Sequence, residues 1–176
     1  MASAERSLSD TARLFVALWP GPEVGQALQA WGRRWPGVAA AQPVPLQRLH
    51  LTLHFLGDVP RDWLPGLMAA IAVPFTPFVL PLGRSALWPG GIAVLEPERV
   101  PAPLARLHAA IGERLQRLSL PTEARPFRPH VTLARRAGTA AAPGSGPPVH
   151  WPVRGFVLVE SHRPPDTGYR IVQRYR

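Results

Sequence analysis

The sequence predicts an α+β protein built from two lobes that are related by an approximate two-fold repeat. Segments with strand-like and helix-like patterns follow one another along all 176 residues. One short pattern, a histidine and a threonine two residues apart in an apolar run, occurs at 50–52 and again at 130–132. Apolar residues make up 46% of the chain, which excludes a mainly disordered protein. We therefore expect one bilobal domain over residues 1–176, with one His-x-Thr strand in each half.

The elements of the first half follow from apolar periodicity and from the positions of prolines. Pro22 and Glu23 suit the first turn of a helix, and Trp31 and Trp35 continue its apolar stripe, so we expect both tryptophans in the core. Prolines in the run 75–82 limit it to an edge strand. The expected elements are a loose tail at 1–12, a buried strand at 13–19, a helix at 22–35, a loop at 36–47, the first motif strand at 50–56, a helix at 60–73 and the edge strand at 75–82.

The second half contains the clearest helix of the chain. Leucines and isoleucine recur at spacings of three and four over residues 101–118. Pro89 begins a Pro-Gly-Gly turn that predicts a hairpin. The expected elements are hairpin strands at 85–88 and 92–95, the helix at 101–118, the second motif strand at 130–135, a flexible loop at 137–148, a core strand at 151–160 and a closing strand at 169–175.

Composition excludes several classes of function. The chain has no cysteine, so thiolate zinc sites, thiol nucleophiles and redox motifs are absent. No segment approaches the roughly 20 apolar residues that span a membrane, and we expect a monomer in the cytoplasm. The net charge of +9 comes wholly from arginine, which favours a polyanionic partner such as RNA. A codon bias towards G and C explains the same excess, because the chain also lacks lysine and asparagine.

The two motifs carry the chemistry. Side chains alternate along a strand with a period of two, so His50 and Thr52 share one face, as do His130 and Thr132. Imidazoles with a pKa near 6.5 divide the roles of acid and base, and threonine hydroxyls donate hydrogen bonds to phosphate oxygens. Such a site suits transfer at an activated phosphodiester, for example a 2',3'-cyclic phosphate, with no metal required.

The alternation of side chains along a strand also predicts which face the residues next to each motif occupy. It puts His54 on the face of the first histidine, so His54 is a candidate for contact with substrate. It puts Arg128 and Arg136 on the face of the second histidine, and of these two we favour Arg128 for contact with phosphate. It turns Arg135 away from that face. Three phenylalanines are expected in the core, although one aromatic ring can stack on a base: Phe15, Phe55 and Phe127.

Residues 48–59 and 125–135 resemble the paired His-x-Thr signatures of the 2H phosphoesterase superfamily. The branch that they resemble is the RNA 2',3'-cyclic phosphodiesterases, also called 2'-5' RNA ligases. Residues 13–18 and 156–161 are similar to that branch as well. The resemblance implies a LigT-like fold, in which two antiparallel sheets line a central groove and helices lie outside.

The resemblance also implies the roles of the site residues. His50 is the proton donor, His130 is the proton acceptor, and Thr52 and Thr132 hold the phosphate. The substrate is an RNA end with a 2',3'-cyclic phosphate, the product is a 2'-phosphomonoester, and the reverse reaction makes a 2'-5' bond. No metal or nucleotide cofactor is implied.

Other functions stay open on the sequence alone. A related enzyme can act on small cyclic nucleotides or on 2'-5' oligonucleotides, and a non-catalytic module can bind RNA in the same groove. A metallohydrolase would use His50, His54 and His130, but Asp58 is the one carboxylate near the first motif.

Overall fold

The computed structural model describes residues 10–35, 41–138, 141–165 and 167–176. The strands are β1 (Thr11–Leu18), β2 (Gln42–Pro43), β3 (Leu51–Pro60), β4 (Phe78–Leu82), β5 (Arg84–Trp88), β6 (Ile92–Glu96), β7 (Val131–Arg135), β8 (Val149–Val153), β9 (Phe156–His162) and β10 (Gly168–Tyr175). The helices are α1 (Pro22–Arg33), α2 (Leu64–Ala70) and α3 (Ala102–Arg117), with 3₁₀ helices η3 (Leu46–Arg48) and η4 (Arg61–Trp63). Within these residues no helix is both long and apolar enough to cross a membrane.

The two motif strands lie side by side at the centre of the main sheet. Its order is β10-β9-β1-β3-β7-β6-β5, with β2 also paired to β7, and every pair is antiparallel. β3 and β7 meet through one residue pair, Leu51 with Val131. The sheet therefore consists of two halves that join where the two motifs lie. Strands β4 and β8 form a separate two-stranded sheet.

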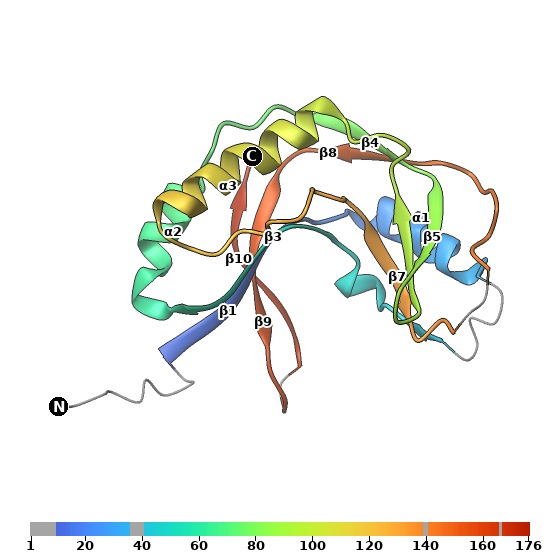
Figure 1. Ribbon diagram of the computed structural model, residues 1–176, viewed down its shortest axis with the longest axis horizontal. Helices are drawn as coiled ribbons and strands as arrows, with labels where there is room; N and C mark the ends of the chain where they lie inside the picture. Colours follow the sequence, from blue (N-terminus) through green and yellow to red (C-terminus); the bar gives the residue numbers. More distant parts are fainter. Residues whose placement is uncertain (1–9, 36–40, 139–140, 166) are drawn as a thin grey trace.

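Each motif strand is covered by a helix from the other half of the chain. Helix α1 packs on β7, and α3 packs on β3 (Figure 1). Both helices approach their strand through a glycine. A Cβ on Gly32 would lie 3.7 Å from Leu133, and a Cβ on Gly112 would lie 3.2 Å from the ring of His54. The exchange of helices ties the two halves together around the motif strands.

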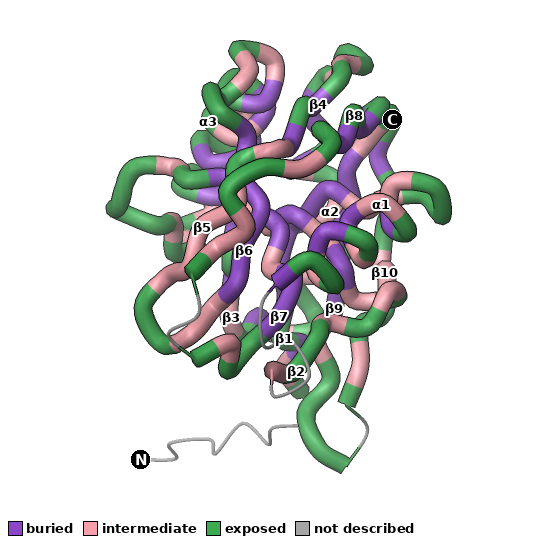
Figure 2. Tube along the Cα trace, turned by 90° about the vertical axis from the view of Figure 1, so that its right-hand side faces the viewer, coloured by how far each residue is buried: buried purple, intermediate pink, exposed green. Residues whose placement is uncertain are grey.

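Buried residues run through the middle of the molecule, along β3, β6 and β7, and exposed residues lie on the outer loops (Figure 2). Trp31 and Trp35 are both buried, as the sequence predicted. The indole N–H of Trp31 donates a hydrogen bond to the carbonyl of Pro147, at 2.8 Å. We expected a flexible loop at 137–148, and this contact fixes its final part on α1. Arg34 adds a second link, because its guanidinium donates to the carbonyl of Ser145 at 3.0 Å.

Several predicted boundaries are wrong. The helix expected at 60–73 is the end of β3 at Pro60, the 3₁₀ helix η4 and then α2, which begins only at Leu64 because Pro65 suits a first helical turn. The expected tail at 1–12 overlaps β1, which begins at Thr11, and residues 1–9 lie outside the described part.

The expected core strand at 151–160 is two strands, because β8 pairs with β4 up to Val153 and the chain then enters β9 beside β1. Gly155 lies at this break, where a Cβ would collide with the carbonyl oxygen of Tyr175.

Candidate active site

One groove of about 1200 Å³ contains both His-x-Thr motifs. His50, Thr52, His130 and Thr132 all line it. The antiparallel contact between β3 and β7 brings these side chains together from positions 80 residues apart in the chain. The two motifs therefore form one site.

The two histidines are held in the same way. The Nδ1–H of His50 donates to the carbonyl of Arg48 at 2.6 Å, and the Nδ1–H of His130 donates to the carbonyl of Arg128 at 2.9 Å. A carbonyl only accepts, so each Nδ1 carries the hydrogen and each Nε2 is left for proton transfer. In its neutral form each ring is a base at Nε2, and in its protonated form it is an acid at the same atom.

A β-bulge in β3 changes the face of the residues that follow Thr52. Thr52 and His54 pair with successive residues of β1, so Leu53 is an extra residue. The extra residue turns His54 into the interior, where it is 4% exposed and its Nε2–H donates to the carbonyl of His108 at 2.8 Å. His54 is among the residues that line the groove, as predicted, but its side chain is buried and its Nε2–H is already bonded. The same reversal exposes Phe55, which was expected in the core and is 56% exposed at the groove wall.

Strand β7 contains a matching bulge. Thr132 and Ala134 pair with successive residues of β6, so Leu133 is the extra residue. Ala134 is turned into the core, and Arg135 is turned into the groove. The prediction that Arg135 faces away is therefore wrong for the same reason as for β3. The positive charge of Arg135 contributes to lowering the pKa of both groove histidines.

His50 lies among aromatic rings. Its ring stacks on Trp19 with centroids 5.3 Å apart, and the rings of Phe15 and Tyr169 lie at 5.0 and 5.4 Å. Burial lowers the pKa of His50, and the charge of His130 acts in the same direction, against the hydrogen bond to the carbonyl of Arg48.

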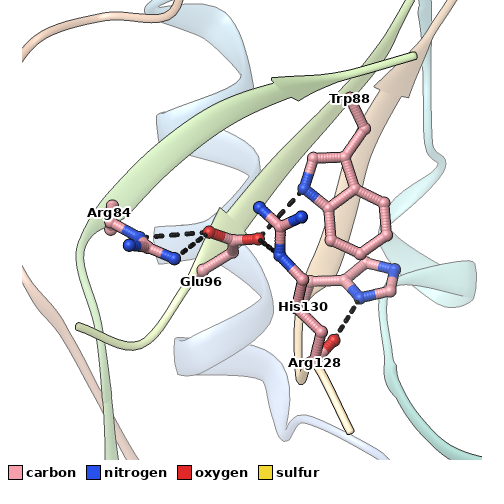
Figure 3. A network of polar contacts seen from close by, with 5 residues as sticks. All are labelled: Arg84, Trp88, Glu96, Arg128 and His130. Atoms are coloured by element: carbon pink, nitrogen blue, oxygen red, sulfur yellow. Dashed lines mark hydrogen bonds and ion pairs between the residues drawn. The ribbon is translucent and has the colours of Figure 1, made fainter. Parts of the chain in front are cut away.

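His130 has polar neighbours. Its ring lies 4.1 Å from that of Trp88, whose indole N–H donates to Glu96 at 3.0 Å. Arg128 pairs with the same carboxylate at 2.9 Å (Figure 3). Burial lowers the pKa of His130, and the backbone hydrogen bond to Arg128 and the charge of Glu96 oppose this shift.

The groove is suited to an anion. Among the described residues that line it, the one carboxylate is Glu123, which pairs with Arg125 at 2.9 Å. Five arginines line the groove: Arg13, Arg48, Arg125, Arg128 and Arg135. A groove of this charge attracts a phosphate chain by long-range electrostatics.

The residues proposed for a metal site do not come together. His54 lies on the other face of β3 from His50, and Asp58 pairs with Arg163 at 2.7 Å. Across the described parts of the chain, no group of three or more His, Cys, Asp or Glu side chains is placed to hold a metal ion.

Sequence reasoning missed Trp88, Glu96 and Tyr169. Glu96 carried the clearest signal, since a single acidic residue ends the apolar run of β6. Trp88 and Tyr169 carried none, because each belongs to a different strand from the motifs and reaches the histidines through the order of the sheet.

Comparison with known proteins gives a consistent result. A family model of the 2'-5' RNA ligase superfamily matches residues 20–165. An RNA 2',3'-cyclic phosphodiesterase of Thermus thermophilus is 34% identical, over 93% of this chain and 89% of the relative. One of Escherichia coli is 30% identical, over 76% of this chain and 77% of the relative.

Solved structures agree with the sequence comparison. The structure of E. coli LigT complexed with 3'-AMP has a TM-score of 0.84 and 27% identity, with 94% of this chain and 97% of that chain covered. The structure of TT0787 of T. thermophilus has a TM-score of 0.74 and 32% identity, with 93% and 96% covered. These likenesses confirm the LigT-like α+β fold expected from the sequence. The chain belongs to the 2'-5' RNA ligase superfamily.

Proposed function

We propose that this protein hydrolyses RNA 2',3'-cyclic phosphate ends to 2'-phosphomonoesters by acid–base catalysis between two histidines. The observation that carries the proposal is the matched tethering of His50 and His130, which leaves both Nε2 atoms for one groove. The relatives named RNA 2',3'-cyclic phosphodiesterase, at 34% and 30% identity, support the choice of substrate.

The reaction uses one histidine on each side of phosphorus. Nε2 of His130 takes a proton from water as the water oxygen forms a bond to phosphorus. The bond from phosphorus to O3' breaks, and Nε2 of His50 gives its proton to that oxygen. The products are a 2'-phosphate and a free 3'-hydroxyl, and the proton balance is restored when the two histidines exchange one proton with solvent. With a 5'-hydroxyl in place of water, the same steps form a 2'-5' bond. Each proton transfer contributes about 10²–10⁴-fold in rate.

The phosphate is held by hydroxyls and guanidinium groups. Thr52 and Thr132 follow the histidines on the groove face, and their hydroxyls donate to the non-bridging oxygens. Arg128 and Arg135 line the same groove and supply positive charge, which the phosphate shares with the histidines. His54 is not part of this phosphate site, because its Nε2–H is already bonded to the carbonyl of His108.

We further propose that the protein acts as a monomer in the cytoplasm on RNA. One chain supplies both histidines, so the chemistry needs no second subunit. The absence of cysteine fits a reducing compartment. The proposed proton transfers are carried by imidazoles, so the reaction needs no metal.

The proposal is tested with a dinucleotide that ends in a 2',3'-cyclic phosphate, in excess chelator and followed by phosphorus NMR. The expected product is the 2'-phosphomonoester. His50→Ala and His130→Ala are each expected to lose at least about 10²-fold in turnover while retaining the thermal stability of the wild type. His150→Ala, at an exposed histidine of β8, serves as the matched control and keeps full activity. A 3'-phosphate product, or turnover above a few per cent in either groove variant, would refute the proposal.

A further inference from the structure

We propose that Glu96 is a positioning residue for the half of the site that contains His130. Glu96 holds Trp88 and Arg128 against His130, and it thereby directs the terminal nitrogens of Arg128 at the bound phosphate. The substrate in this inference rests on the proposed function. The four side chains, together with Arg84, form one connected network (Figure 3).

Both oxygens of Glu96 are fully used. The side chain is 2% exposed and ends β6 next to β7. Oε1 accepts from the indole N–H of Trp88 at 3.0 Å and from Nε of Arg128 at 2.9 Å. Oε2 accepts from Nη2 and Nε of Arg84 at 2.7 and 3.1 Å. Loss of the charge of this carboxylate leaves the four donor groups without an acceptor of equal strength.

Arg128 is fixed at both its backbone and its side chain. Its carbonyl accepts the Nδ1–H of His130, and its Nε binds Glu96. Its guanidinium carbon lies 4.5 Å from the ring centre of Trp88, whose ring also contacts His130. Because Nε is used for Glu96, the two terminal nitrogens of the guanidinium extend beyond the ion pair, and the side chain is 59% exposed in the groove. This arrangement presents a pre-oriented fork to a phosphate.

The two groove histidines, His50 and His130, differ in their charged neighbours. The charged groups that act on His130 are Glu96 from β6, Arg128 from the approach to β7 and Arg135 from β7. The charge of His130 in turn acts on His50, which directly precedes β3. Glu96 is the one negative group among those that act on His130, and its charge opposes the fall in the pKa of His130. A change at Glu96 therefore alters the titration of one histidine of the pair.

The experiment compares Glu96→Gln with Glu160→Gln. Glu160 is a matched control, since it is 5% exposed and binds two arginines, Arg61 and Arg170, but it does not line the groove. The readouts are KM and kcat on the cyclic dinucleotide across pH and the titration of the His130 ring by NMR. The NMR titration needs no turnover, so it tests the inference even where the proposed substrate fails.

In Glu96→Gln we expect KM to rise about tenfold, with a smaller change in kcat, because the charge-assisted bond that orients Arg128 is lost. The titration of His130 moves to lower pH, because the charge of Glu96 that raises its pKa is lost. Glu96→Asp keeps the charge and restores the titration of His130. Glu160→Gln changes neither quantity, even where it lowers the melting temperature. An unchanged KM and an unchanged His130 titration in Glu96→Gln, or an equal shift of that titration in Glu160→Gln, would overturn the inference.

Discussion

Replacing His108 with glutamine tests how α3 is held on the bulge of β3. The ring of His108 stacks on His54 at 4.1 Å and on Phe127 at 3.8 Å, and it is hydrogen-bonded to the backbone of Leu53. His54 returns a bond from Nε2 to the carbonyl of His108, and its buried Nδ1 has no hydrogen-bond partner. Burial, and then the neighbouring charge of His54, lower the pKa of His108 to about 4. Burial also lowers the pKa of His54.

These shifts make stability depend on pH in one direction. The unfolded chain titrates near pH 6.5, so below this pH it binds more protons than the folded chain does. The contribution of the neutral His54 and His108 rings to the free energy of unfolding is therefore fully present above pH 6.5 and is lost as the pH falls towards 4. With a folded pKa of about 4, the loss from His108 reaches at most about 3 kcal/mol at pH 4, and partial exposure of the ring reduces it.

Urea unfolding followed by tryptophan fluorescence at a series of pH values measures this dependence. His108→Gln removes the titration, and its amide N–H still reaches the carbonyl of Leu53. We expect the variant to match wild type within about 1 kcal/mol at pH 8 and to exceed it by about 2 kcal/mol at pH 4. His150→Gln, at an exposed histidine, controls for the loss of one imidazole. If the free energy of unfolding falls with pH in parallel for wild type and His108→Gln, the pair of His54 and His108 does not set the stability in acid.

Two further predictions concern the groove. Because the pKa values of His50 and His130 are both lowered, kcat/KM should follow a bell-shaped curve with its maximum below pH 6.5, and a flat profile from pH 5 to 8 would contradict the two-histidine mechanism. Arg135→Gln should raise KM about tenfold at low ionic strength and less at high salt, because a groove charge is lost. Arg136→Gln, next in the chain but not among the groove-lining residues, is the control, and an equal effect of both variants would refute the assigned position of Arg135.

The sequence was sufficient for the helices α1 and α3 and for the meeting of the two motifs. Apolar periodicity predicted α1 and α3 closely, since each buries one face of a regular helix. The repeated His-x-Thr pattern placed one motif in each half, and the antiparallel contact of β3 with β7 joined them. Regular alternation also placed His50 and Thr52 correctly, because the bulge of β3 comes after them.

The two bulges could not be predicted from the pattern. Leu53 and Leu133 are apolar residues at apolar positions, so nothing marks either one as an extra residue. A shift of one residue exchanges the two faces of a strand, and every assignment beyond the bulge is then reversed. This single cause explains the burial of His54 and the errors at Phe55 and Arg135.

Contacts between distant strands were also beyond the sequence. Glu96 and Trp88 belong to a hairpin whose strands and turn the pattern predicted, but not its place in the sheet. Their contact with His130 depends on the register of β6 on β7, and that register contains the bulge at Leu133. The network around His130 is therefore a product of tertiary structure.

The most direct test of the central claim separates the acid from the base by the leaving group. A nucleoside p-nitrophenyl phosphodiester releases p-nitrophenolate, which needs no proton, whereas the cyclic phosphate releases an alkoxide that does. On the p-nitrophenyl substrate, His50→Ala should hydrolyse within about tenfold of wild type, while His130→Ala should remain inactive on both substrates. Equal loss of activity on both substrates in His50→Ala, or turnover of either substrate by His130→Ala, would contradict the assignment of His50 as the acid and His130 as the base.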